Sequence, residues 1–244
     1  MSVVGNGGAT GGRTALVTGA SQGIGRATAV RLSREPSVSN LVLVARNASA
    51  LDETAAACEG GTARIDRVAA DLSNLDSIPG LVEDIHGRHG SIDVLLNIAG
   101  YAEPKSLLDT TAQNLVTTFT VNVFAMLILT REVVRHMQGR PTKIVNIAST
   151  AGITARPGWV AYASSKAAVV SLSQTLSEEL AGTGVKIYTI SPGRTATELR
   201  RKLAPEEDPS TIMQPDAVAD VIAMLVAEGE RTLDGQNIIV RQQI

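Results

Sequence analysis

Short runs of β-branched and aliphatic residues alternate along the chain with longer stretches of helical periodicity, and this alternation limits the possible folds most. Strands are predicted at residues 15–18, 41–44, 65–69, 94–96, 144–147, 186–190 and 238–240. Helices are predicted between them at about 23–35, 48–58, 74–88, 110–138, 159–182 and 215–228. The strand runs are apolar on both faces, which is typical of a covered parallel sheet. We therefore expect one doubly wound α/β domain, with seven parallel strands and helices on both faces.

Two stretches depart from the alternation. Residues 1–12 are rich in glycine and predict a flexible leader, which leaves 13–244 as a single catalytic domain. Residues 195–214 separate the last two predicted strands and hold many charged residues and two prolines. An insertion at the carboxyl edge of such a sheet predicts a substrate loop that covers a ligand.

Composition argues against several classes of protein. The single cysteine, Cys58, cannot form an intrachain disulfide and fits a reducing, cytoplasmic compartment. A net charge of −2 without a basic block argues against nucleic-acid binding. The longest apolar run, Val123–Leu129, is much shorter than the ~20 residues of a membrane helix. Three histidines leave little material for a metal site, so we expect none.

A glycine-rich loop follows the first predicted strand and opens the first helix. Residues 19–25 read Gly-Ala-Ser-Gln-Gly-Ile-Gly. Glycines at this place allow a tight turn, and the N-terminus of the helix offers N–H groups to a pyrophosphate. The same residues match the G-x-S-x-G nucleophile elbow of α/β-hydrolases. That elbow needs earlier strands to supply the oxyanion loop, and barely a dozen residues precede the first predicted strand, which argues against a hydrolase.

The end of the second predicted strand indicates which dinucleotide binds. Ala45 stands where an acidic residue would hold the ribose 2′-hydroxyl of NAD, and Arg46 follows it. A guanidinium without a competing carboxylate favours the 2′-phosphate of NADP. Arg46 as a solvated loop charge is the alternative. Asp71, after the third strand, either contacts the adenine or caps the helix that starts near Asn74.

Tyr162 precedes Lys166 by four residues, so both lie on one face of a predicted helix. An ammonium near the phenol is expected to lower the pKa of Tyr162 and to suit it for proton transfer. Ser149 ends the fifth strand and is placed to hold a substrate oxygen; simple turn chemistry is the alternative explanation for a serine there. Asn122 lies in an apolar helical stretch, either as a link from Lys166 to solvent through water or as a plain core amide.

These motifs together resemble those of the classical short-chain dehydrogenase/reductase family. Residues 18–25 match its T-G-x-x-x-G-x-G, residues 97–100 resemble N-N-A-G, and residues 192–197 resemble P-G-x-x-x-T. The resemblance covers about residues 13–240. It implies a Rossmann fold and hydride transfer between a nicotinamide and a carbonyl or alcohol carbon of a small molecule. It also implies a homotetramer or homodimer that pairs the helices at 110–138 and 159–182.

The resemblance also implies roles for individual residues. Tyr162 would be the general acid/base, Lys166 would hold the nicotinamide ribose, Ser149 would orient the substrate and Asn122 would anchor the proton relay. Cofactor contacts are implied for Gly19, Ser21, Gln22, Gly23, Ile24, Gly25, Arg46, Asp71, Leu72, Asn97, Ala99, Gly100, Tyr162, Lys166, Pro192, Gly193, Thr195 and Thr197. Trp159 and Arg194 are candidates for the substrate pocket, where Trp159 either stacks on a ring or packs under the insertion.

We therefore expect an NADP(H)-dependent carbonyl reductase, with NADP(H) favoured over NAD(H). The alternative is a nucleotide-sensing binding protein that kept the fold without catalysis. The basic residues Arg194, Arg200, Arg201 and Lys202 indicate either an anionic substrate or a solvated helix face. The C-terminal residues 235–242 lack the family's usual Asp-Gly-Gly ending.

Overall fold

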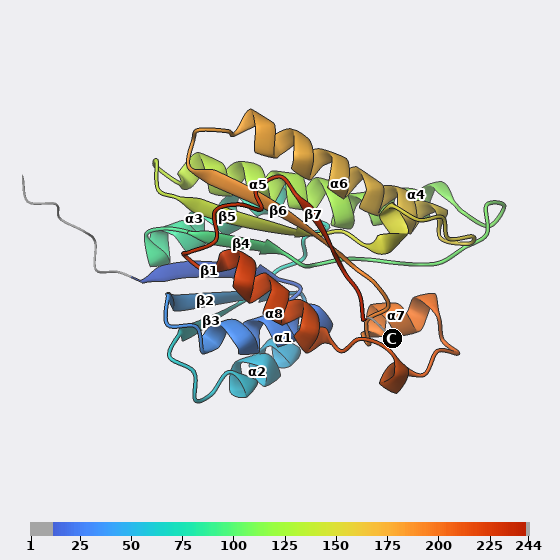
Figure 1. Ribbon diagram of the computed structural model, residues 1–244, viewed down its shortest axis with the longest axis horizontal. Helices are drawn as coiled ribbons and strands as arrows, with labels where there is room; N and C mark the ends of the chain where they lie inside the picture. Colours follow the sequence, from blue (N-terminus) through green and yellow to red (C-terminus); the bar gives the residue numbers. More distant parts are fainter. Residues whose placement is uncertain (1–11, 243–244) are drawn as a thin grey trace, which may run out of the picture.

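Seven parallel strands form one sheet in the order β3-β2-β1-β4-β5-β6-β7. The structure, a computed structural model, describes residues 12–242 (Figure 1). The strands are β1 Arg13–Thr18, β2 Val38–Ala45, β3 Arg64–Ala69, β4 Val94–Asn97, β5 Thr142–Ile147, β6 Val185–Pro192 and β7 Asn237–Val240. The predicted fold class is confirmed. Residues 1–11, most of the predicted leader, lie outside the described residues.

Helices cover both faces of the sheet. Figure 1 shows α1 (Gly23–Ser33), α2 (Ala48–Ala57) and α8 (Pro215–Val226) on one side. The other side carries α3 (Ile78–His89), α4 (Ala112–Phe119), α5 (Ala125–His136) and α6 (Val160–Glu179). This two-sided cover is what continuous apolar strand runs require.

Consecutive residues of the central strands enter two different cores. Ala15 and Val17 of β1 join a cluster with α1 and α8, whereas Leu16 between them joins a cluster with α3 and α5. All three side chains are fully buried. The edge strands β3 and β7 differ from the prediction, since several of their residues are half-buried or exposed. An edge strand has a neighbour on one side only, so it is covered less completely.

The helix predicted at 110–138 is interrupted in the middle. A π-helical turn, Thr120–Phe124, separates α4 from α5 and contains Asn122. The side chain of Asn122 bonds both the backbone N–H and the carbonyl of Tyr101. π-Turns inside helices frequently mark functional sites, and this one lies beside the catalytic candidates.

The whole stretch Ala112–His136 is 25 residues long and apolar enough, by length and composition, to cross a membrane. The prediction from the longest apolar run missed this, because isolated polar residues interrupt that run without ending the helix. Within the fold, α5 packs against α3, and its Leu129 and Val133 are buried in the core between these helices and the sheet. A core helix of this kind meets the same criterion of length and composition.

The predicted insertion 195–214 contains a short helix that the sequence did not indicate. This helix, α7 (Glu198–Leu203), begins at Thr197, whose hydroxyl accepts the backbone N–H of Arg200 at 3.1 Å. A bridge between Thr195 and Met213 closes the base of the insertion. Six residues, four of them charged, are too few for a periodic apolar pattern to be recognised.

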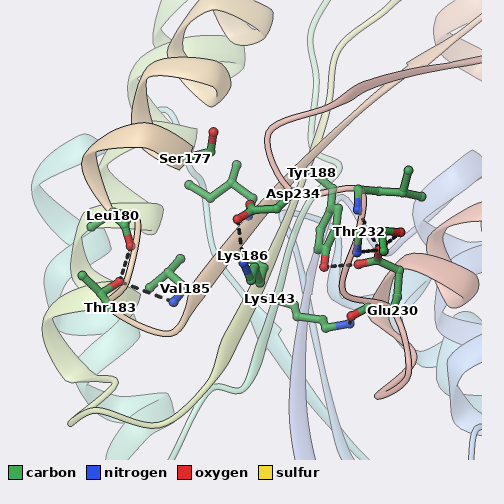
Figure 2. A network of polar contacts seen from close by, with 12 residues as sticks. Lys143, Ser177, Leu180, Thr183, Val185, Lys186, Tyr188, Glu230, Thr232 and Asp234 are labelled. Atoms are coloured by element: carbon green, nitrogen blue, oxygen red, sulfur yellow. Dashed lines mark hydrogen bonds and ion pairs between the residues drawn. The ribbon is translucent and has the colours of Figure 1, made fainter.

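A polar network fixes the end of α8 to β5 and β6 (Figure 2). The Lys143 ammonium donates to the backbone carbonyls of Leu225, Ala227 and Glu230 at 3.0, 2.6 and 3.0 Å. The hydroxyl of the fully buried Tyr188 donates to the Glu230 carboxylate. Burial alone would raise the pKa of Glu230, but this bond and two backbone N–H groups lower it. A lysine thus satisfies one carbonyl group in the last turn of the helix and two that follow it.

Removing the Tyr188 hydroxyl tests this network. Tyr188→Phe should lower the free energy of unfolding by about 1.5–3 kcal/mol, because a hydrogen bond to a charged carboxylate is lost. Urea denaturation at pH 7 measures the change. Tyr101→Phe is the matched control and should change the stability less, since its hydroxyl also donates to a glutamate, the exposed Glu103.

The pH dependence has a definite sign. A glutamate whose pKa is lowered by folding stabilises the protein above its unfolded pKa, and that contribution disappears as the pH falls through the folded pKa. The difference in the free energy of unfolding between wild type and Tyr188→Phe should therefore become smaller at acid pH. A difference that stays constant from neutral to acid pH would contradict this role of Glu230.

Candidate active site

A cavity of about 560 Å³ lies at the carboxyl ends of strands β1 to β6. The candidates from the sequence that line it are Gly19, Ser21, Gln22, Gly23, Ile24, Gly25, Arg46, Asp71, Leu72, Ala99, Gly100, Ser149, Trp159, Tyr162, Lys166, Pro192, Gly193, Arg194, Thr195 and Thr197. Asn97 and Asn122 do not line it. Parallel strands bring their carboxyl ends to one edge of the sheet, which places residues far apart in the sequence around one space.

The glycine loop is packed so closely that two of its positions exclude a side chain. Gly19 has φ +66°, and a Cβ there would lie 2.8 Å from the Cα of Ala99. A Cβ on Gly25 would lie 2.1 Å from the carbonyl oxygen of Gly19. Helix α1 begins without a side-chain cap, so its first N–H groups are not taken up by a capping residue. This backbone cradle fits the pyrophosphate of a dinucleotide.

The Thr18 hydroxyl joins the glycine loop to the end of β4. It donates to the carbonyl of Leu96 and accepts the N–H groups of Ile98 and Ala99 at 3.0 and 3.1 Å. Asn97 is buried beneath these residues, and its amide donates to the Asn146 side chain at 2.8 Å. Asn97 therefore supports the floor of the cavity from below, while Ala99 and Gly100 line it.

The ends of β2 and β3 carry Arg46 and Asp71. Within residues 12–242, no hydrogen bond or ion pair engages the exposed Arg46 side chain. Asp71 accepts the N–H and the hydroxyl of Ser73, and these bonds lower the pKa of its carboxyl. The short helical turn Leu75–Ser77 has no side-chain cap, so the interpretation of Asp71 as a helix cap was wrong.

Tyr162 and Lys166 lie on one face of α6 and are both buried, with 7% and 3% exposed. The Lys166 ammonium donates to the backbone carbonyl of Ile147, the last residue of β5, at 2.7 Å. Ser149 lies two residues beyond Ile147, and its hydroxyl accepts the N–H of Ala151 at 3.1 Å. One hydrogen bond from the helix to the sheet thus brings the three side chains to the same wall of the cavity.

The pKa of Tyr162 differs from the prediction. Burial raises it, while the nearby Ser149 hydroxyl and the charge of Arg200 only oppose the shift. Burial also lowers the pKa of Lys166 to about 8. In the protein alone, desolvation therefore outweighs the expected effect of the ammonium, which bonds the Ile147 carbonyl and lies 5.9 Å from the centre of the phenol ring.

Asn122 uses both amide hydrogens within the protein. It donates to the carbonyl of Tyr101 and to the hydroxyl of Ser165, both at 2.9 Å. Its amide oxygen accepts the N–H of Tyr101 at 2.7 Å. Ser165 in turn donates to the carbonyl of Tyr162 at 2.7 Å. The side chain thus connects the π-turn, the loop after β4 and the helix that carries Tyr162.

Trp159 packs under the insertion. Its ring meets that of Tyr162 edge-on, with centroids 6.3 Å apart, and the Arg200 guanidinium lies 5.5 Å from its centre. Arg200 is held there by two N–H bonds to Glu207, at 2.6 and 2.8 Å. Of the two interpretations of Trp159, packing under the insertion describes this contact, although the residue also lines the cavity.

Known proteins resemble this chain in sequence. A family model described as short chain dehydrogenase matches residues 13–208. The chain belongs to this family. The 3-oxoacyl-[acyl-carrier-protein] reductase FabG of Thermotoga maritima is 31% identical, over 92% of this chain and 94% of its own length. The NADP-dependent 3-hydroxy acid dehydrogenase of Schizosaccharomyces pombe is 30% identical, over 93% and 92%.

Solved structures agree. A short chain dehydrogenase from Burkholderia cenocepacia in complex with NADP has a TM-score of 0.85 and 27% identity, with 95% of this chain and 97% of that one covered. A short-chain type dehydrogenase/reductase from Mycobacterium marinum has a TM-score of 0.87 and 26% identity, with 95% and 94% covered. This member of the short-chain dehydrogenase family is therefore an oxidoreductase that acts on CH–OH or carbonyl groups with a nicotinamide cofactor.

Sequence reasoning missed several residues around the cavity of this short-chain dehydrogenase. Asn47 and Tyr101 line it directly after Arg46 and Gly100, and their places beyond strand ends were a usable signal. Leu199 and Leu203 line it from α7, inside the insertion that was predicted to cover a ligand, although nothing in the sequence indicated the helix itself. Arg156 lies in the stretch 151–159, which the sequence also favoured for the substrate pocket, and it lines the cavity from there.

The close packing of the glycine loop gives a direct prediction. Gly25→Ala should destabilise the protein by about 1–3 kcal/mol and weaken dinucleotide binding, because the new Cβ overlaps the Gly19 carbonyl. Gly80→Ala is the control. A Cβ on this exposed glycine of α3 would meet nothing within 4 Å beyond its own helix backbone, so the variant should gain about 0.5–1 kcal/mol. Urea unfolding and cofactor titration measure both; equal stability of the two variants would contradict the packing argument.

Proposed function

We propose that the protein is an NADP(H)-dependent oxidoreductase that interconverts a carbonyl group and a secondary alcohol of a small molecule, with Tyr162 as the general acid/base. The observation that carries this proposal is the joint burial of Tyr162 and Lys166 beside Ser149, on a wall continuous with the glycine cradle. The names of the relatives support it, since FabG of Thermotoga maritima is a reductase and the Schizosaccharomyces pombe protein a dehydrogenase.

Each residue has a step that its position suits. NADPH, when bound, supplies the hydride that reaches the carbonyl carbon. Ser149 orients the substrate oxygen, and the Tyr162 phenol donates the proton that this oxygen needs. Lys166 holds the nicotinamide ribose and the phenol in place, and Asn122 keeps the π-turn that anchors the proton relay. Gly19–Gly25 bind the pyrophosphate, and Thr195 and Thr197 contact the nicotinamide side.

The raised pKa of Tyr162 gives the proposal a pH dependence. A phenol with a raised pKa is protonated at neutral pH, which is the form that carbonyl reduction requires. Reduction should therefore hold through neutral pH and decline in alkali. Oxidation of the alcohol needs the deprotonated form and should increase over the same alkaline range.

Tyr162→Phe tests the catalytic role. This variant should lose about 10²- to 10⁴-fold in turnover, because the proton donor is removed. NADPH binding, followed by fluorescence titration, should remain. Tyr188→Phe is the control, since it removes a phenol far from the cavity and should keep wild-type activity per folded molecule. Near-wild-type turnover by Tyr162→Phe on a ketone found by screening would contradict the mechanism.

We propose Arg46 as the contact for the 2′-phosphate of NADP. Arg46 lines the cavity beside Ala45 at the end of β2, and neither position offers a carboxylate to a ribose hydroxyl. The structure from Burkholderia cenocepacia, which holds NADP, and the NADP-dependent relative from Schizosaccharomyces pombe support this preference.

Reversal of this charge tests the preference. Arg46→Glu should raise the Kd for NADPH about tenfold or more and leave that for NADH nearly unchanged, since a charge-assisted bond to the phosphate is lost. Arg64→Glu, the same change at the exposed amino end of β3, is the control. If wild-type protein binds NADH more tightly than NADPH, the role of Arg46 is wrong.

We also propose a cytoplasmic homotetramer or homodimer. Apolar side chains are exposed on adjacent helical segments, with Val116 of α4 58%, Phe124 of the π-turn 45% and Val160 of α6 44% exposed. Apolar side chains exposed on neighbouring helical segments favour association. The helices concerned are those that the family resemblance pairs between subunits. The buried, unpaired thiol of Cys58 fits a reducing compartment.

A further inference from the structure

A second cavity of about 250 Å³ adjoins the first one. Thr150, Arg156, Gly193 and Arg194 line both cavities, so the two spaces share one wall. The remaining lining residues are Thr154, Thr211, Ile212, Met213, Arg241 and Gln242. The second cavity is therefore a side pocket beside the insertion, and Figure 1 shows the chain after β7 returning to the neighbourhood of α7.

Three arginines line this side pocket, and no acidic residue does. Arg194 has an ion pair with Glu207 at 3.2 Å. Among the described residues, the Arg156 guanidinium bonds only the adjacent carbonyl of Ala155, at 3.2 Å. Within residues 12–242, Arg241 forms no ion pair or side-chain hydrogen bond. Arg156 and Arg241 therefore have no counter-charge among the described residues, and an anion in the pocket would supply one to both.

The uncharged lining residues also suit an anion. Thr150 and Thr154 bring hydroxyl-bearing side chains to the pocket, whereas the hydroxyl of Thr211 already donates to the carbonyl of Asp208 at 2.8 Å. Ile212 and Met213, both 5% exposed, form an apolar part of its wall. Hydroxyl groups and guanidinium groups are donors for carboxylate and phosphate oxygens. Such a wall suits a ligand with a charged end group, which the donors bind, and a short carbon chain, which packs on the apolar residues.

Arg200 and Arg201 of α7, in contrast, have acidic partners. Glu207 engages Arg200 with two bonds, and Glu198 pairs with Arg201 at 3.1 Å. Arg201 and Lys202 line neither cavity. The interpretation of these residues as a solvated helix face therefore fits Arg201 and Lys202. The positive charge of the side pocket comes instead from Arg156, Arg194 and Arg241, of which the sequence pattern singled out only Arg194.

We infer that the side pocket binds an anionic group of the substrate, a carboxylate or phosphate, while the carbonyl group lies at Tyr162. This inference rests on the proposed function and narrows its substrate class to carbonyl or hydroxy compounds with a negative charge at a distance from the reacting carbon. Arg241 and Arg156 provide the charge, and Arg194 is shared with Glu207. When the side pocket holds the anionic group, the rest of the substrate is oriented, and the reacting carbon is placed at Tyr162.

A homologous series of straight-chain methyl-keto acids, compared with their methyl esters, tests this inference. Wild type should prefer the acid over the ester in kcat/KM, with a maximum at one chain length set by the distance between the pocket and Tyr162. Arg241→Gln should lower the ratio of acid to ester about tenfold or more, since a charge-assisted bond is lost. Arg201→Gln, which removes an equal charge from α7 outside both cavities, should leave that ratio unchanged.

A binding measurement distinguishes this inference from the proposed function. With the dinucleotide site saturated by NADP⁺, inorganic phosphate should raise the Tm of wild type and of Arg201→Gln, but not that of Arg241→Gln. Turnover of esters and acids at equal efficiency, without a phosphate effect, would overturn the inference and leave the proposed function standing. If wild-type protein turns over none of the acids or esters, but phosphate still raises its Tm, the proposed function is refuted and phosphate binding in the side pocket stands.

Discussion

The hydrogen bond from the Lys166 ammonium to the carbonyl of Ile147 is the contact on which the site depends most. It joins the middle of α6 to the last residue of β5 inside the protein, at 2.7 Å. Tyr162 lies one turn earlier on the same helix, and Ser149 lies two residues beyond that strand end. A displacement of α6 along the sheet would therefore separate the phenol from the serine. In a buried setting such a bond is costly to leave unmade, which holds the arrangement in one register.

Polar contacts of the same kind continue beneath the site. Asn97 bonds Asn146, whose amide donates to Ser173 of α6 at 3.0 Å. Asn122 bonds Ser165, whose hydroxyl donates to the carbonyl of Tyr162. Buried amides must find partners, and here the partners come from strands, the π-turn and α6. The cavity wall is thus supported by polar groups that would be expensive to leave unpaired in an aliphatic core.

The strands and most helices were predictable from the sequence because an apolar run or periodic apolar pattern extends over most of the length of each one. The strand runs at 15–18 and 144–147 became β1 and β5 with two added residues at their amino ends. Edge strands were predicted as fully covered, since periodicity does not indicate which strand lies at an edge. The glycine loop and the Tyr162–Lys166 spacing were recognisable because their chemistry is local.

Other features depend on contacts between distant segments. The side chain of Asn122 in the π-turn bonds the backbone of Tyr101, 21 residues away, and α7 has too few residues for a pattern. The pKa of Tyr162 follows burial, which the spacing to Lys166 does not report. The side pocket brings together Arg156 and Arg241, which are far apart in the sequence. Such pairs follow from tertiary structure alone.

Hydride transfer from NADPH to a carbonyl carbon beside Tyr162 is the step that defines the proposed activity. The most direct measurement is the mass of the alcohol formed by wild-type enzyme from NADPH deuterated at both positions of nicotinamide C4, with a ketone selected by screening. We expect one deuterium on the carbinol carbon. An alcohol without deuterium, or no alcohol from any carbonyl compound despite tight NADPH binding, would rule out this hydride transfer.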